Sequence, residues 1–243
     1  MRKRVLLLAV SCKNGGLCPG GIDLDHPEKW IRIVKDDGRA GAVQGIDIAF
    51  AKPLDIIEFY GRPMPQGRQV ENWVIDNRSC RKTGSRDPGI LEWAYQQYSY
   101  NGFWNNFRAY LTVDEMNTGT EPSESIMKVS NVRIYRNDYG NAKIDFKWSG
   151  ARFPLTGISM TDQEFYPKIQ DGEVHFDNAY IVVSIPKDAD WEHPDTGEGR
   201  AYKFVSRIYG LGSSNTQTQN IRSYFSERRG RVVSDSYQDD LPF

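Results

Sequence analysis

The chain has 243 residues, and its 31 Lys and Arg against 32 Asp and Glu give a formal net charge of -1. This length predicts one large domain or two small ones, and either can bury a core. The longest wholly apolar run, Val5–Val10, is far too short for a transmembrane helix. We therefore expect a soluble globular protein with no membrane partner.

The first residues and the cysteines both favour the cytoplasm. Met1–Arg4 is basic and precedes the apolar run, as in an export signal, but so short a run of mostly branched aliphatic residues predicts a first β-strand instead. Cys12, Cys18 and Cys80 are an odd number without a C-x-x-C pair, which argues against a disulfide framework and a zinc site. We expect a reducing compartment and no metal or other cofactor.

Short runs rich in Val, Ile, Phe, Tyr and Trp, separated by Gly, Pro and Asp, predict β-strands in the first half of the chain. The predicted strands are Arg4–Val10, Gly21–Asp25, Trp30–Val34, Ile46–Phe50, Asp55–Tyr60 and Gln69–Ile75. The turn residues between the second and third of them predict a hairpin. Apolar spacings of three and four predict helical segments at Gly89–Tyr98 and Phe103–Leu111.

The second half repeats this pattern after a polar, acidic segment at 114–125, which is the predicted linker. The strands predicted there are Met127–Arg136, Lys143–Trp148, Tyr180–Pro186 and Arg200–Tyr209. The fold class is therefore mainly β, with two small barrels of the oligonucleotide-binding (OB) type in tandem, at 1–113 and 126–211, and short helices. A single larger sandwich is the alternative. Residues 212–243 begin with a polar, low-complexity stretch that is typical of a flexible tail.

The near-neutral total hides two domains of opposite charge. Residues 1–113 carry 16 Lys and Arg against 12 Asp and Glu, a net +4, whereas residues 114–212 carry 11 against 16, a net -5. If nucleic acid binds, the first domain is the expected contact.

Two segments of this first domain combine cations with aromatic residues. Arg78–Arg86 holds four cations in a predicted loop, and Trp30–Arg39 adds a basic stripe. Loops and aromatic residues of an OB barrel follow a single strand by charge and base stacking. The residues predicted to bind nucleic acid are Lys13, Trp30, Arg32, Lys35, Arg39, Arg78, Arg81, Lys82 and Arg86.

Lys13 lies in a glycine-rich segment, Ser11–Gly21, that follows the first strand. Its backbone N–H groups suit a phosphate cradle, but it has neither a Walker A nor a G-x-G-x-x-G pattern. A tight connection between strands is the other interpretation, and both stay open at this point.

Catalysis finds little support in the sequence, and we expect no enzyme activity and no catalytic residues. There is no G-x-S-x-G or H-E-x-x-H pattern. Asp23 and Asp25 would suit a metal-dependent nuclease, but Asp is also ordinary in turns.

The last five residues are Asp239, Asp240, Leu241, Pro242 and Phe243. A partner can capture such an end through the terminal carboxylate, an apolar pocket for Phe243 and a basic rim for the two Asp residues. This end resembles the acidic tip of bacterial single-stranded-DNA-binding proteins, which docks replication and repair proteins.

Residues about 1–212 resemble the dual-OB-containing domain family. The matching residues in the first half are Leu8, Ala9, Ser11, Lys13, Gly15, Gly16, Cys18, Gly20 or Gly21, and Trp30–Arg32. Those in the second half are Val129–Tyr135, Asp145, Phe146, Leu155, Thr156, Thr161, Asp162 and Ala201–Val205. The resemblance implies two barrels that bind nucleic acid, often in mobile-element or defence settings, and it brings no catalytic residues.

We therefore predict a cytoplasmic protein that binds single-stranded nucleic acid, with DNA favoured over RNA. Through its C-terminal tip it would recruit replication, repair or defence partners that have a pocket for an acidic Leu-Pro-Phe end. The alternative is an adaptor or inhibitor that binds no polynucleotide and mimics that tip, or that senses a nucleotide.

Overall fold

The computed structural model describes residues 1–13, 16–35, 48–76, 79–98, 104, 106–149, 151–170, 172–189 and 191–212. The elements of the first half are β1 (Arg2–Lys13), β2 (Gly16–Asp23), β3 (Trp30–Val34), β4 (Asp55–Pro63), β5 (Asn72–Ile75), β6 (Arg81–Ser85) and α2 (Ile90–Tyr98). They are followed by β7 (Tyr110–Thr112), α3 (Val113–Thr118), β8 (Glu124–Arg136), β9 (Ala142–Trp148) and β10 (Leu155–Met160). The remaining elements are the short helical turns η2 (Gln163–Phe165) and η3 (Pro167–Ile169) and the strands β11 (Val174–Ser184), β12 (Trp191–Glu192), β13 (Gly199–Tyr202) and β14 (Phe204–Leu211).

Five strands of the first half close into a ring. The order is β1–β2–β3–β5–β4, and β4 pairs back onto β1. The hairpin of β2 and β3 is antiparallel, as predicted, whereas β3 and β5 run parallel. β6 continues the sheet by pairing with β4 outside the ring.

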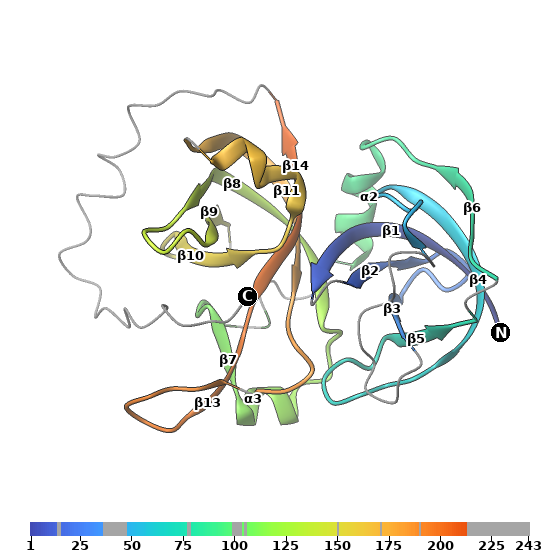
Figure 1. The fold of residues 1–243 in the computed structure, drawn as a ribbon, viewed down its shortest axis with the longest axis horizontal. Coiled ribbons are helices and arrows are strands. Elements are labelled where there is room, and N and C mark those ends of the chain that lie inside the picture. Colours follow the sequence, from blue (N-terminus) through green and yellow to red (C-terminus); the bar gives the residue numbers. More distant parts are fainter. Residues whose placement is uncertain are drawn as a thin grey trace.

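The second half repeats this topology in a closed barrel made of β8, β9, β10, β14 and β11. Numbered within each barrel, both rings have the order 1–2–3–5–4, and in both the third and fifth strands are parallel, here β10 and β14. A five-stranded ring of this Greek-key kind is the OB barrel. The prediction of two OB-like barrels in tandem is confirmed, and Figure 1 shows them side by side.

Alternate strand positions fill each barrel with apolar side chains, because successive residues of a strand point to opposite faces. The interior of the first barrel contains Val5, Leu7, Ile31, Ile33, Ile57, Phe59 and Ile75. The interior of the second contains Met127, Val129, Val132, Ile134, Ile144, Phe146, Ile158, Ile181, Val183 and Val205.

A third apolar cluster joins the two barrels. Leu6 and Leu8 of β1 pack there with Tyr180 and Tyr209 of the second barrel and with Leu91 of α2. The Tyr209 hydroxyl also donates a hydrogen bond to the Leu8 carbonyl oxygen at 2.8 Å. The barrels therefore bury apolar surface against each other, and α2 covers their junction (Figure 1).

Three local predictions differ from the structure. Phe103–Leu111 is not a helix in its described part, because Tyr110–Thr112 forms β7 and pairs with β13. The predicted strand Arg200–Tyr209 is interrupted at Lys203, and the described residues of Ile46–Phe50 form no strand.

The predicted linker at 114–125 contains most of α3 and the beginning of β8. Thr112 caps α3 through a capping box with Glu115, which satisfies backbone N–H groups at the first turn. In the described part of the chain, no helix has the length and apolar character needed to cross a membrane.

Candidate nucleic-acid interface

Two of the residues predicted to bind nucleic acid, Trp30 and Arg32, are buried. All five residues of β3 are buried, and Trp30 and Arg32 are 2% and 6% exposed. The outer side of this strand faces the second barrel, because the Arg32 guanidinium donates to the hydroxyls of Ser123 at 2.8 Å and Ser184 at 3.3 Å. The prediction that these two side chains contact nucleic acid does not fit this structure, because another barrel occupies the space in front of them.

Arg32 is the centre of a buried ionic cluster. Its guanidinium lies 3.5 Å from a carboxylate oxygen of Glu71 and 3.5 Å from one of Glu124. Burial raises the pKa of Glu124 to about 7, against the opposing effect of Arg32. The fit is close, since a Cβ on Gly20 would lie 2.1 Å from a Glu124 oxygen. Glycine at position 20 therefore allows this carboxylate to approach β2.

The segment predicted as a basic loop is mostly a strand, β6, which pairs with β4 outside the ring of five strands. Arg81 and Lys82 are exposed over 70% and 44% of their side chains, and Arg86 is exposed as well. Arg81 donates to Glu58 at 2.6 Å and Lys82 lies 2.6 Å from Asp55. Among the predicted residues, Arg81, Lys82 and Arg86 are exposed cations that lie in β6 or directly after it.

Four further residues that the sequence analysis missed complete a surface around Arg81. Arg2 lies opposite Tyr60, and Arg4 lies opposite Glu58, in the pairing of β1 with β4. Arg62 follows Tyr60 by two residues on β4 and therefore shares its face. We call Arg2, Arg4, Tyr60, Arg62 and Arg81 the basic face; Arg2 and Arg81 pair with Glu58, and Arg4 pairs with Asp25.

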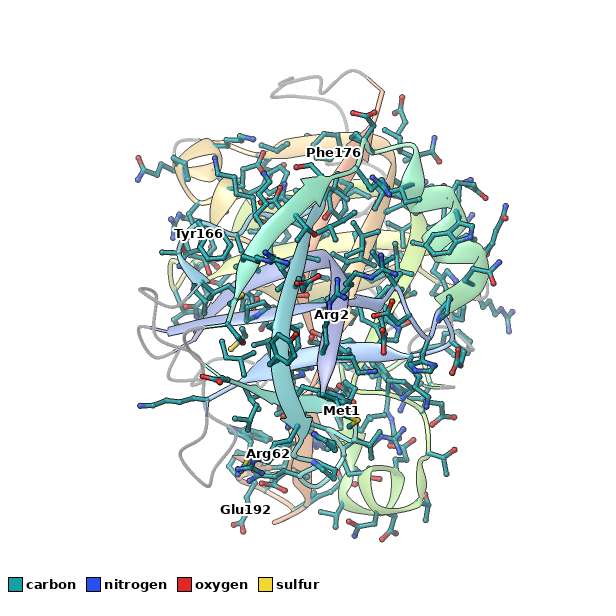
Figure 2. All side chains as sticks on the ribbon, turned by 90° about the vertical axis from the view of Figure 1, so that its right-hand side faces the viewer. Met1, Arg2, Arg62, Tyr166, Phe176 and Glu192 are labelled. Carbon is teal, nitrogen blue, oxygen red and sulfur yellow. The ribbon has the colours of Figure 1, made fainter. Side chains whose placement is uncertain are left out.

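Figure 2 looks onto this face, with Arg2 beside β4 and Arg62 near one end of it. Glu58 accepts hydrogen bonds from Arg2 and Arg81, and these lower its pKa. Tyr60 remains 54% exposed. Four arginines, three of which share the two acids Glu58 and Asp25, and an exposed ring can bind phosphates and stack on a base. The sequence held a signal for Arg2 and Arg4: they are two residues apart at the start of the first strand and therefore share one face of it.

The acidic pair considered for a nuclease is neutralised within the protein. Asp23 accepts from the Lys3 ammonium at 2.5 Å and Asp25 from Arg4 at 2.6 Å, and the latter bond lowers the pKa of Asp25. Among the residues that the structure describes, no group of three or more His, Cys, Asp or Glu is placed to hold a metal ion.

The glycine-rich segment is a hairpin of β1 and β2, with Lys13 paired to Gly16. The backbone groups of the paired residues form the hydrogen bonds between β1 and β2. This favours a tight connection between strands over a phosphate cradle. Lys35 is half-buried just after β3. The Lys13 side chain, Arg39, Arg78 and the predicted partner-binding residues Asp239–Phe243 lie outside what the structure describes.

Two OB barrels of identical strand order, joined through a buried ionic cluster, define a tandem OB protein. The model of the dual OB-containing domain family matches residues 3–208, and the chain belongs to this family. The comparison with curated proteins found no match. Among solved structures, the tetrameric p202 HIN2 is similar over 84% of this chain and 91% of its own, at 12% identity. Its TM-score of 0.28 is too low to support an argument.

Proposed function

We propose that this protein binds single-stranded nucleic acid, with DNA as the first candidate, and that it is a binding protein rather than an enzyme. The basic face is the observation that carries the proposal. Its arginines protrude from neighbouring strands of an OB barrel, and Tyr60 supplies an aromatic surface among them. Strand binding of this kind needs cations for the phosphates and an open ring for a base.

The first test is fluorescence anisotropy with labelled single-stranded DNA, single-stranded RNA and duplex DNA over a range of salt concentrations. We expect the tightest binding for a single strand and a steep loss with salt, because phosphate contacts release counterions. Absence of binding to all three at low salt would refute the proposal.

Replacing Arg62 and Arg81 together by Ala is expected to weaken single-strand binding and to make it less salt-dependent. The loss of two phosphate contacts should reduce the slope of log affinity against log salt by about 1.4. The matched control is Arg136→Ala, since Arg136 is an exposed arginine of the second barrel that bonds to the Gly140 carbonyl. An unchanged slope in the double variant would remove these arginines from the interface.

We further propose that the tip Asp239–Phe243 recruits a replication, repair or defence protein. This rests on the sequence: two acids precede the apolar residues Leu241, Pro242 and Phe243, which suits capture by an apolar pocket with a basic rim. Deleting the five residues should leave strand affinity within about twofold and abolish partner capture in a pull-down. If the truncated chain retains the same partners, the tip has another role.

The second candidate is an adaptor or inhibitor that binds protein or a nucleotide without polynucleotide. The net charge of -5 over residues 114–212 favours it, because this half repels a polyanion overall. Partner capture by the full chain without strand binding at low salt would select it.

A further inference from the structure

Two exposed phenylalanines and one half-buried tryptophan lie at or beside the place where β9 leads into β10. Trp148 is the last residue of β9, and Phe153 lies in the connection to β10. Phe107, from the segment before β7, places its ring 5.8 Å from that of Trp148 at an angle of 38°. We call these three residues the aromatic end.

Two of these three rings are exposed. Phe107 and Phe153 are 55% and 56% exposed, whereas Trp148 packs partly against the barrel core. The barrel therefore holds Trp148 in place, and Phe107 extends the aromatic surface from it. Large apolar side chains grouped at a surface commonly mark a binding site.

Three exposed cations, Arg108, Lys147 and Arg152, are sequence neighbours of these aromatic residues, although the second half of the chain is acidic. Arg152 lies over the Phe153 ring at 5.3 Å, and both Arg152 and Lys147 are exposed. Arg108, next to Phe107, is exposed over 44% of its side chain while it bonds to Glu115. The local charge therefore suits a polyanion better than the net charge of this half indicates.

We propose that the aromatic end is a second contact for single-stranded nucleic acid, in which unpaired bases stack on Phe107, Trp148 and Phe153 while Lys147 and Arg152 meet the phosphates. This inference rests on the proposed function and extends it to the second barrel. In Figure 1 the strands β9 and β10 lie in the barrel on the side opposite to β4 and β6, so this contact is separate from the basic face. The basic face supplies mostly charge, and the aromatic end supplies mostly stacking.

The test compares the full chain with the variant Phe107→Ala/Phe153→Ala on two strands of equal length, oligothymidylate and an abasic strand with the same phosphates. Stacking predicts that the variant binds oligothymidylate at least about fivefold more weakly. Its affinity for the abasic strand and its salt slope should stay unchanged. Tyr139→Ala, which removes a ring 64% exposed in the β8–β9 connection of the same barrel, is the control and should bind as the unaltered chain.

The outcomes separate the two proposals. If the unaltered chain binds neither strand, the proposed function fails. If it binds oligothymidylate and the double variant binds equally well, the aromatic end is not a nucleic-acid contact and the proposed function stands. An equal loss on both strands also overturns stacking. Because both phenylalanines are exposed, the variant should retain the thermal transition of the unaltered chain, which is measured alongside.

Discussion

Replacing Arg32 by Leu is expected to lower the free energy of unfolding by about 3–5 kcal/mol, because two buried carboxylates lose their shared cation. Glu71 and Glu124 are 5% and 2% exposed, and each lies 3.5 Å from the guanidinium. Leu removes the charge and the hydrogen bonds to Ser123 and Ser184. The barrels would then meet across an uncompensated negative pair.

The free energy of unfolding of Arg32→Leu is measured by denaturant unfolding, and Arg86→Leu is the matched control. Arg86 is exposed and bonds only weakly along the chain, to the Ser85 carbonyl at 3.3 Å, so its loss should change stability by less than about 0.5 kcal/mol. Adding Glu124→Gln to Arg32→Leu should recover part of the loss, because the amide carries no charge. A variant that unfolds like the original chain but binds nucleic acid more weakly would restore the original prediction that Arg32 contacts the strand.

Most strands of the two barrels could be predicted from the sequence because their patterns are local, but β10 (Leu155–Met160) was not among the predicted strands. Trp30–Val34 is predicted with the bounds that β3 has, and Lys143–Trp148 misses the first residue of β9. The strand β6 was missed because its sequence, RKTGS, carries no apolar alternation and gains its structure only by pairing with β4.

The partners of the strands could not be predicted in the same way. Arg32 looks like a surface cation in the sequence, and only the position of the second barrel makes it the centre of a buried cluster. One signal was present: apolar residues occupy both faces of Trp30–Val34, which is typical of a strand buried on both sides. An arginine in such a strand indicates a buried ion pair more than an open binding site.

The predicted strand Arg200–Tyr209 is interrupted at Lys203, and the surroundings of this residue explain the interruption. It is 1% exposed, and its ammonium nitrogen lies 2.6 Å from Asn106 Oδ1 and 3.3 Å from the Asn106 carbonyl oxygen. Its backbone N–H donates to the Ala109 carbonyl instead of to a barrel strand. The residue thereby links the segment before β7 to the second barrel. Burial lowers the pKa of Lys203 to about 6, although Glu115 opposes this effect.

We expect this lysine to make the protein more stable as the pH rises above neutral. Between about 6 and its ordinary value of 10.5, Lys203 is neutral in the folded chain and protonated in the unfolded one. The unfolded state therefore binds one proton more, and the free energy of unfolding rises by up to about 1.4 kcal/mol per pH unit. Glu124 acts in the opposite direction, but its pKa of about 7 confines that effect to lower pH.

Denaturant unfolding at about pH 8 and about pH 9.5 should show this gain in the original chain and not in Lys203→Met, a difference of up to about 2 kcal/mol. Methionine keeps the length of the side chain and cannot be protonated. The matched control, Lys52→Met, removes an exposed lysine and should follow the original chain. If Lys203→Met shows the same rise as the original chain, Lys203 stays protonated in the folded state, and its bond to Asn106 then compensates the burial of a full charge.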